Sequence, residues 1–454
     1  MDFYYLLIIL SVGLQAERGI FDFLSYFKLF KQLSQKGSNK PKKAKKPLYV
    51  LIPVLNEQEI IEDTMLSILK IKNKYFKINI AILTTIKEKI NNKDKKMPTT
   101  EEIINNSIKS GKLSIFKDSI QIFQDPDIDG KMATQLNYAI NKLKNIVSQS
   151  TYYLVLNADS KISSSTFRQL SRLIDKNKGK EFAFQQPCAF VKDVDASANQ
   201  FTNALSLYQS WYCLGHESRL VRSYNNKSIN NWNKNNNTKL GVIVGHGSGM
   251  TLNINLRNGG YPANLMTEDL TFGFNLSVNS VPILSLPALE LADVPNKFTI
   301  FIKQKSVWFW NFLGYINCYK HNIKKGHSRY KLFLLLTQGI GAGAYWFFDT
   351  FFIVTPLIIG VIKNSYLIIV LSLISFLIFY ILPQFILFLK LPKVLFDQGF
   401  KREAESLKET SFTKLLPSLC LIILTNSVGA WIALAQYIKY LLTGKMPVKY
   451  KTGD

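Results

Sequence analysis

Three long apolar stretches in the last third of the chain constrain its fold more than any other feature. They cover Leu332–Ile362, Tyr366–Leu389 and Phe412–Leu442, and few charges interrupt them. Each is longer than the roughly 20 apolar residues that a helix needs to cross the hydrocarbon of a bilayer. A charged block of about 300 residues lies before them, which is enough for one large domain with its own core. The sequence therefore predicts a water-soluble domain joined to membrane-spanning helices.

The N-terminus has the pattern of a further membrane anchor. Two apolar segments, Tyr4–Leu14 and Ile20–Phe30, precede the basic tract Lys40–Lys46. A cleaved signal peptide would carry its positive charge before the apolar part, so this order favours an uncleaved anchor. Because positive charge stays on the cytoplasmic side, we expect the N-terminus outside and residues 31–330 in the cytosol.

The same charge rule does not fix the number of crossings. It places the basic segment Lys390–Glu409 in the cytosol. Three single crossings would then put Lys445, Lys449 and Lys451 outside, against the rule. Two alternatives remain at this point: the stretch from Leu332 is not a single crossing, or the tail breaks the pattern.

The composition favours a membrane surface over nucleic acid as the partner of the positive charge. The chain has 454 residues and a net charge of +25, but its lysines are dispersed, and the one dense run follows the apolar anchor. Attraction to anionic lipid headgroups explains such a run. The histidines are scattered and the cysteines show no CxxC spacing, so we expect reduced thiols and neither a zinc site nor a His/Cys metal enzyme; the cysteines are Cys188, Cys213, Cys318 and Cys420.

The soluble block has the sequence pattern of an α/β domain. Segments at Glu57–Leu69 and Gly130–Leu143 have helical apolar spacing. Four short apolar runs alternate with such segments, which predicts a parallel sheet covered on both faces. Polar residues follow all four runs, so we expect one ligand crevice outside the carboxyl ends of the strands. The four runs are Leu48–Ile52, Ile78–Leu83, Ile120–Phe123 and Tyr152–Leu156.

Two acidic motifs carry candidate chemistry. Asp159 closes the fourth run within Asn157-Ala158-Asp159-Ser160, where a carboxylate could hold a divalent cation against a diphosphate or could simply form a turn or helix cap. The second motif, Thr267-Glu268-Asp269, begins a helical segment, where acidic residues are common for dipole reasons alone. Glycine-rich segments at Gly245–Gly249 and Gly259–Gly260 precede it and permit close backbone approach to a ligand.

An aromatic segment at Phe298–Tyr319 separates the soluble block from the apolar stretches. Gln304 and Trp308 lie four residues apart in it, so they share one face of a helix. The segment is amphipathic, as interfacial helices are. Trp308 therefore has two interpretations at this stage, as a membrane-interface anchor or as a residue that stacks on a ligand.

In order, these motifs resemble those of the membrane-integrated family-2 glycosyltransferases, which include cellulose, chitin and hyaluronan synthases and ceramide glucosyltransferase. The motifs are Pro53-Val54-Leu55-Asn56-Glu57, Gly130–Asn137, Asn157-Ala158-Asp159, Thr267-Glu268-Asp269 and Gln304-Lys305-Ser306-Val307-Trp308. The resemblance covers roughly residues 47–310. It implies a cytosolic nucleotide-diphospho-sugar transferase (GT-A type) domain at 47–297, between an anchor and linker at 1–46 and interfacial helices at 298–330. Membrane helices at 331–442 and a tail at 443–454 would follow.

The resemblance also implies a reaction and a role for each motif residue. The protein would be a hexosyltransferase that uses a nucleotide-sugar donor, Mg²⁺ or Mn²⁺, and a lipid or glycan acceptor. Asp269 would be the base, with Glu268 beside it, and Asp159 would bind the metal. The donor would contact Pro53, Asn56, Glu57 and Lys131, and the acceptor would contact Gln304 and Trp308.

Three departures from the family pattern bear on function. Asn157 stands where the metal motif starts with Asp, Val307 stands where the last motif has Arg, and Thr84–Glu88 replaces a pair of acidic residues after the second strand. They argue against a processive synthase more than against transfer itself. We therefore expect a single-transfer inverting enzyme of polysaccharide or glycolipid synthesis in a bacterial plasma membrane.

Three alternatives are weighed against this expectation. One is a processive polysaccharide synthase that secretes its product, and another is a catalytically degenerate membrane partner of a second transferase. A transporter is disfavoured, because Asp349 is the single charge placed centrally in the apolar stretches.

Overall fold

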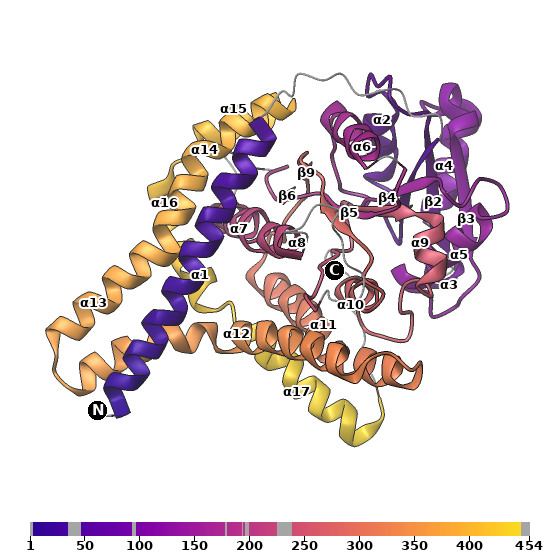
Figure 1. Ribbon diagram of the computed structural model, residues 1–454. Coiled ribbons are helices and arrows are strands. Elements are labelled where there is room, and N and C mark those ends of the chain that lie inside the picture. The colour runs from indigo at the N-terminus through magenta and orange to yellow at the C-terminus, as the bar shows by residue number, and fades with distance from the viewer. Residues whose placement is uncertain are drawn as a thin grey trace.

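The computed structural model describes residues 3–34, 47–92, 97–177, 179–192, 194–195, 199–224 and 238–445. An α/β sheet domain lies beside a group of long helices formed by both ends of the chain (Figure 1). The predicted α/β domain with N- and C-terminal helices is thereby confirmed. The basic tract Lys40–Lys46 and most of the polar segment Asn225–Lys239 lie outside the described residues.

The four predicted strands are present and run parallel in the order β3-β2-β1-β4. They continue into three further strands, so that the sheet has the order β3-β2-β1-β4-β7-β5-β8. Strand β7 (Ser248–Thr251) is antiparallel to both β4 and β5 (Ala183–Gln185), while β8 (Ile283–Ser285) is parallel to β5. The sheet is therefore mixed, and the expectation of a parallel sheet holds only for its first half, which comprises β1 (Leu48–Pro53), β2 (Ile78–Thr85), β3 (Ile120–Asp125) and β4 (Tyr152–Val155).

Helices cover both faces of the sheet because side chains alternate along its strands. In β1, Leu48 and Val50 pack toward α2 (Ile61–Leu69) and α6 (Ser164–Lys176). On the opposite face, the core includes residues of β1, α5 (Met132–Leu143) and α10 (Asp269–Val278). These two apolar layers fix the sheet, and they leave its polar carboxyl edge open for a site.

A single glycine permits β7 to pair beside β4. A Cβ atom on Gly249 would lie 2.1 Å from the Tyr153 carbonyl oxygen and 2.4 Å from the Phe184 ring. No other residue fits at that distance. Since β7 runs opposite to β4, the loop that enters β7 lies at the carboxyl end of β4, where the ligand crevice is expected.

Within the part of the chain that the structure describes, three helical stretches are long and apolar enough to cross a membrane, namely Arg329–Ile362, Tyr366–Gln398 and Phe412–Thr443. The first is helix α12, and the second is continuous through α13 (Tyr366–Phe376), the π-helical turn η5 (Leu377–Ile381) and α14 (Leu382–Gln398). Large apolar side chains are exposed where α1 begins, where α12 ends and where α13 begins, a surface that fits lipid rather than water. Those side chains include Phe3, Leu6, Ile9, Ile358, Val361, Ile362, Tyr366, Leu367 and Leu371.

The third stretch, predicted as Phe412–Leu442, is interrupted by a turn. It forms α16 (Phe412–Leu424) and α17 (Val428–Thr443), which run in different directions (Figure 1). Helix α17 packs against α11 (Phe298–Lys324), where the Trp310 and Tyr437 ring centroids lie 5.6 Å apart. The last apolar stretch is thus the interrupted one, while the stretch from Leu332 lies within a single helix.

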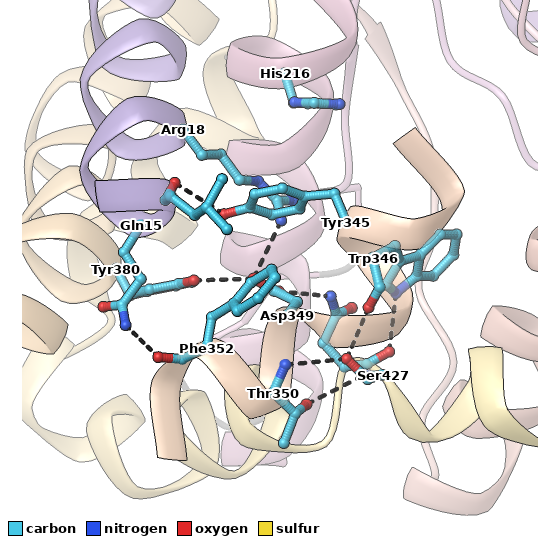
Figure 2. Close-up of polar contacts among 12 residues, drawn as sticks. Gln15, Arg18, His216, Tyr345, Trp346, Asp349, Thr350, Phe352, Tyr380 and Ser427 are labelled. Atoms are coloured by element: carbon cyan, nitrogen blue, oxygen red, sulfur yellow. Dashed lines mark hydrogen bonds and ion pairs between the residues drawn. The ribbon is translucent and has the colours of Figure 1, made fainter. Parts of the chain in front are cut away.

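Helix α12 supplies the hydrogen bonds that the break between α16 and α17 would otherwise lack. Trp346 donates its indole N–H to the Asn426 carbonyl at 2.9 Å, and the Ser427 hydroxyl donates to the Trp346 carbonyl at 2.7 Å (Figure 2). The Thr350 hydroxyl donates to the Leu424 carbonyl at 3.0 Å. Unpaired backbone groups are costly in lipid, so these contacts make the break stable.

The N-terminal segment forms one helix, α1 (Phe3–Ser34), and its polar middle does not interrupt it. Helix α1 is not among the three apolar helical stretches, since charged residues occupy its centre. There, an Arg18 guanidinium nitrogen lies 3.3 Å from Asp349 Oδ1 on α12 (Figure 2). Arg18 Nε also lies 3.6 Å from Asp22 Oδ2. The Tyr380 hydroxyl also donates to Asp349 Oδ1, at 2.9 Å. Asp349, the charge that lies centrally in the apolar stretches, is therefore paired with Arg18.

The same charge network ties α1 to the sheet domain. Asp22 Oδ1 lies 3.0 Å from Arg219 Nε on α8 (Ser218–Tyr224) and 3.3 Å from His216 Nδ1 on the π-helical turn η2 (Tyr212–Glu217). Arg222 donates to the Ser25 carbonyl at 2.7 Å. One face of α1 thus contacts membrane-type helix α12 while another contacts the polar domain.

We expect Asp349→Ala to destabilise the protein more than Asp349→Asn. Alanine leaves Arg18 buried without its nearest carboxylate on α12, and breaking such a pair typically costs about 3–5 kcal/mol. Asparagine keeps an oxygen for the Tyr380 hydroxyl and should lose less. Thermal unfolding in detergent measures both, with the exposed Glu405→Ala on α15 (Lys401–Glu409) as the control. Equal melting temperatures for Asp349→Ala and the control would contradict the structural role of the network.

Candidate functional site

The carboxyl ends of β1 and β2 are held together by one buried side chain from α5. Gln135 donates its amide to the Val54 carbonyl at 2.9 Å and to the Leu83 carbonyl at 2.8 Å. Val54 N–H also donates to Leu83 O at 3.0 Å. Sequence reasoning included Gln135 in a motif but gave it no role. Its contacts show that it positions the loop that follows β1.

That loop holds the predicted donor residues Pro53, Asn56 and Glu57, all of which are half-buried. Asn56 has φ +56°, in the left-handed region that asparagine tolerates better than most residues. Glu57 N–H donates to the Thr100 hydroxyl at 3.0 Å, and Asn92 donates to Asn56 Oδ1 at 3.4 Å. The structure thus brings the three predicted residues into one tightly turned loop at the sheet edge.

Glu88 fixes the outer side of this loop. Its side chain is buried, and Oε1 accepts hydrogen bonds from Thr100 N–H and the Thr100 hydroxyl, both at 2.7 Å. Gln58 donates to the same oxygen at 3.1 Å. Glu88 belongs to the segment that departs from the family pattern, so one buried acid stands near the position where a pair was expected.

Lys131 lies at the first turn of α5 and faces the second acidic motif. Its Nζ donates to the Leu265 carbonyl at 3.4 Å, two residues before Thr267. Its backbone N–H donates to the Thr134 hydroxyl at 2.9 Å, which caps the helix. Helix N-termini favour anions, so a diphosphate at this point would meet both the helix end and a lysine.

Asp159 lies on the turn after β4 and is half-buried. Its Oδ2 accepts a hydrogen bond from Asp293 N–H at 3.4 Å, and the next residue, Ser160, accepts from Asn157 N–H at 3.0 Å. The turn interpretation is therefore confirmed, while the helix-cap interpretation is wrong. The cap of α6 is Ser163, whose side chain accepts from Ser165 N–H.

The residues of this turn fit a hard divalent cation that is shared with a ligand. The Asp159 carboxylate and the Asn157 amide are oxygen donors, both half-buried. Mg²⁺ and Mn²⁺ prefer oxygen ligands, and Mg²⁺ is usually held by one or two carboxylates together with substrate phosphates and water. A closed, all-protein cage for such an ion would need more oxygens than these two residues supply.

Asp269 begins α10, and two backbone groups orient its carboxylate. Gly245 N–H donates to Oδ2 at 3.1 Å, and Leu270 N–H donates to Oδ1 at 2.7 Å. Asp269 remains half-buried, whereas its neighbour Glu268 is buried. A carboxylate held in this way keeps lone pairs for a proton, as a general base requires.

The segment from Gly245 to Gly247, here called the β7 entry loop, contacts the second acidic motif and the strand that leads into the first. Gly245 binds Asp269 as described, and Gly247 N–H donates to the Val155 carbonyl at 2.8 Å, just before the Asp159 turn. His246 Nδ1 lies 3.1 Å from Glu290 Oε2. Burial acts to lower the pKa of His246, but the Glu290 carboxylate raises it to about 9. The loop that orients the predicted base is therefore anchored to the strand that leads into the predicted metal residue.

The predicted acceptor residues Gln304 and Trp308 lie on α11 as expected. Gln304 is buried, and its Oε1 accepts from the Gln209 amide at 3.1 Å. Trp308 is half-buried and packs against an apolar cluster that includes Trp346 of α12 and Met266, the residue before Thr267. Trp308 thus packs on a cluster that reaches both the aromatic layer near α12 and the second acidic motif, so both interpretations of its role keep a physical basis.

Lys305 is a further charged residue of this region to which sequence reasoning gave no role. It is only 2% exposed, and the structure gives it no hydrogen bond or ion pair among the described residues. Burial lowers its pKa to about 8. It stands two residues before Val307, where the resembled family has arginine. Five aromatic rings surround its Nζ at centroid distances of 4.6–5.7 Å, from Tyr208, Tyr212, Phe301, Trp308 and Trp346.

No protein-family model and no curated protein matches the sequence. Among solved structures, the chain is similar to the mannosyltransferase PcManGT from Pyrobaculum calidifontis in complex with GDP-Man and Mn²⁺, with TM-score 0.43, 14% identity, and coverage of 91% of this chain and 99% of that one. It is also similar to S. aureus TarS 1–349 in complex with UDP-GlcNAc, with TM-score 0.37, 12% identity, and coverage of 88% and 92%. At these scores neither likeness carries a conclusion about what this chain binds or does.

The burial of Lys305 predicts a specific pH dependence of stability. Its pKa is about 8 in the folded protein against an ordinary value of 10.5, so between these pH values the unfolded state holds the proton and the folded state does not. Stability should therefore rise with pH across this window, by about 3 kcal/mol relative to Lys305→Met, which cannot titrate. Below pH 8, the free energies of unfolding of wild type and of Lys305→Met should change with pH in parallel.

Unfolding of both proteins in detergent from pH 7 to pH 10 measures the difference. The control is Lys303→Met, which removes an exposed lysine from the same helix. A stability difference between wild type and Lys305→Met that is independent of pH would show that the lysine is not buried in solution.

Proposed function

We propose that this chain is a membrane-bound inverting glycosyltransferase, which moves a hexose from a nucleotide-sugar donor to a hydroxyl of a lipid or glycan acceptor. One observation carries the proposal: Gly245 of the β7 entry loop orients the Asp269 carboxylate by a 3.1 Å hydrogen bond, while Gly247 of the same loop binds the end of β4, the strand that leads into the Asp159 turn. The motif resemblance assigns a base and a metal ligand to these two residues. This connection between them, at the carboxyl edge of a GT-A-like sheet, is what that reaction needs.

The donor would lie across the carboxyl ends of β1 and β4 and the first turn of α5. The loop with Asn56 and Glu57 would receive the nucleoside, and Lys131 with the α5 N-terminus would receive the diphosphate. Asp159 would hold Mg²⁺ or Mn²⁺ on the diphosphate, and the ion would offset the charge that develops on the leaving group.

The acceptor hydroxyl would approach the sugar from the Asp269 side. Its oxygen forms the new bond to the anomeric carbon, the bond from that carbon to the diphosphate oxygen breaks, and the hydroxyl proton passes to Asp269. One displacement of this kind inverts the anomeric configuration. Because the Gly245 and Leu270 N–H groups already hold the carboxylate, little reorganisation is needed when the proton moves.

The membrane helices favour an acceptor that comes from the bilayer. Trp308 packs against an apolar cluster that joins Met266, the residue before the second acidic motif, to side chains of α11, α12 and α17. A lipid-linked acceptor could reach Asp269 from that side. We place the sheet domain in the cytosol of a bacterial cell, following the positive charge near the anchor.

A catalytically inactive membrane partner is the second candidate function. The favouring observation is that the predicted acceptor groups already have protein contacts: Gln304 accepts from Gln209, and Lys305 Nζ lies 4.6 Å from the Trp308 ring centroid. Asn157 and Val307 support the same alternative. A processive synthase that secretes a polysaccharide has no comparable observation in its favour.

The proposal predicts that Asp269→Asn abolishes turnover and leaves donor binding largely intact. Loss of a positioned general base typically costs about 10²–10⁴-fold in rate, and asparagine keeps the shape and the contact with Gly245 N–H. A screen of nucleotide sugars that measures released nucleoside diphosphate identifies the donor, and the same assay then measures the variant. Donor binding by calorimetry is the companion measurement.

The control is Asp175→Asn, an exposed acid on α6. It should retain wild-type turnover. Near-normal activity of Asp269→Asn would remove Asp269 as the base. Donor binding without turnover in wild type, with every acceptor class offered, would favour the inactive-partner alternative.

A further inference from the structure

A buried thiol, an imidazole and a carboxylate converge behind the β7 entry loop. Cys188, His246 and Glu290 each place one possible ligand atom within 4.8 Å of the other two. Cys188 lies on β6 (Cys188–Ala189) and Glu290 on β9 (Glu290–Leu291), where they are direct partners in a parallel strand pair. His246 lies in the β7 entry loop. Three separate strand ends therefore bring these side chains together on rigid backbone.

The donor set has the chemistry of a site for a borderline-soft divalent cation. Thiolate, imidazole and carboxylate are the usual ligands of Zn²⁺, at bond lengths of about 2.0–2.3 Å. His246 Nδ1 and Glu290 Oε2 lie 3.1 Å apart, a separation that two neighbouring ligands of one such ion can adopt. Mg²⁺, by contrast, would not select a buried thiol.

The backbone around the cluster is shaped to bring the loop onto Glu290. Gly247 has φ +63°, and a Cβ atom there would lie 2.3 Å from Glu290 Oε2. Glycine is therefore required for this approach. The Ser160 hydroxyl donates to Glu290 Oε1 at 2.5 Å, which leaves the other carboxylate oxygen directed toward His246. Outer contacts of this kind typically orient metal-binding carboxylates.

The charges around the cluster also favour a cation. The Glu290 side chain is fully buried, and the carboxylates of Asp159 and Glu217 act on the same groups, as does the thiol of Cys213. Buried carboxylates are costly unless they are paired or bind a metal. A divalent ion would supply more positive charge than a protonated His246 alone.

We propose that Cys188, His246 and Glu290 bind Zn²⁺ or a similar borderline-soft divalent cation, at a site separate from the ion that accompanies the donor diphosphate. On binding, the Cys188 thiol and a protonated His246 release their protons to solvent, and water completes the coordination. The ion would join the β6–β9 pair to the β7 entry loop and thereby steady Gly245 against Asp269. That effect on activity rests on the proposed function, whereas metal binding does not.

Cobalt substitution in the purified full-length protein tests the proposal. After metal is stripped with a chelator, Co²⁺ should bind at one equivalent and give the near-ultraviolet charge-transfer absorption of a cobalt–thiolate bond. Cys188→Ser should lose this absorption. Cys318→Ser, which changes another buried thiol on α11, should keep it. Zinc should also be present at one equivalent in protein purified without chelator.

Two further variants distinguish the Cys188, His246 and Glu290 site from the residues next to it. Ser160→Ala should weaken Co²⁺ binding about 10–100-fold, the usual effect of losing an outer contact. Asp159→Ala should leave the absorption unchanged, because Asp159 is assigned to the diphosphate ion. No zinc and no thiolate absorption in wild type would overturn the proposal, as would equal loss in the Cys188 and Cys318 variants. A cobalt spectrum without donor turnover would keep the metal site and reject glycosyl transfer.

Discussion

The antiparallel pairing of β7 with β4 is the contact on which the candidate site depends. It is possible because Gly249 lies against Tyr153 without a side chain. The pairing directs the β7 entry loop to the carboxyl end of the parallel strands, where Gly247 N–H binds the Val155 carbonyl at 2.8 Å. The loop that orients the Asp269 carboxylate is thereby anchored to the strand that leads into the Asp159 turn. If β7 ran parallel to β4, the loop would lie at the opposite edge, and the two acidic motifs would be apart.

A second constraint joins this domain to the apolar helices. Helix α1 carries Arg18 and Asp22 one turn apart, and they pair with Asp349 on α12 and Arg219 on α8 respectively. Buried ion pairs contribute more to a specific arrangement than to net stability. The network therefore fixes where the sheet domain lies relative to the apolar surface. For a transferase with a lipid acceptor, that position decides which hydroxyls can reach Asp269.

Much of the fold follows from continuous apolar runs, and the failures have physical causes. The four parallel strands and helices α2 and α5 were predicted, because the strands are continuous apolar runs and the helices show helical apolar spacing. Strands β5, β7 and β8 were not predicted, since they have only three or four residues and β7 contains Gly249. The break between α16 and α17 is invisible in an apolar sequence, because its hydrogen-bond partners Trp346 and Thr350 lie far away along the chain.

The site was predictable to a similar degree. Short motifs placed Asp159, Lys131 and Asp269 at the ends of predicted strands and helices, where polar residues can also serve only as turns and caps. Sequence spacing could not reveal the roles of Lys305 or of the Cys188, His246 and Glu290 cluster. In the sequence, a lysine among aromatic residues is typical of the polar face of an amphipathic helix, so Lys305 gave no sign of burial. The three candidate ligands lie far apart along the chain, so no short motif could connect them. The expectation of no zinc site rested on spacing alone, which tertiary contacts can override.

Hydrogen exchange with and without a nucleoside diphosphate and Mn²⁺ tests the central claim that these motifs form one donor site. The full-length protein in detergent would be exposed to UDP or GDP, and backbone exchange would be followed by mass spectrometry. With the nucleotide that binds, exchange should slow together in the loop after β1, at the α5 N-terminus, in the Asp159 turn and in the β7 entry loop. Protection confined to other segments, or binding that leaves all four unchanged, would contradict the account.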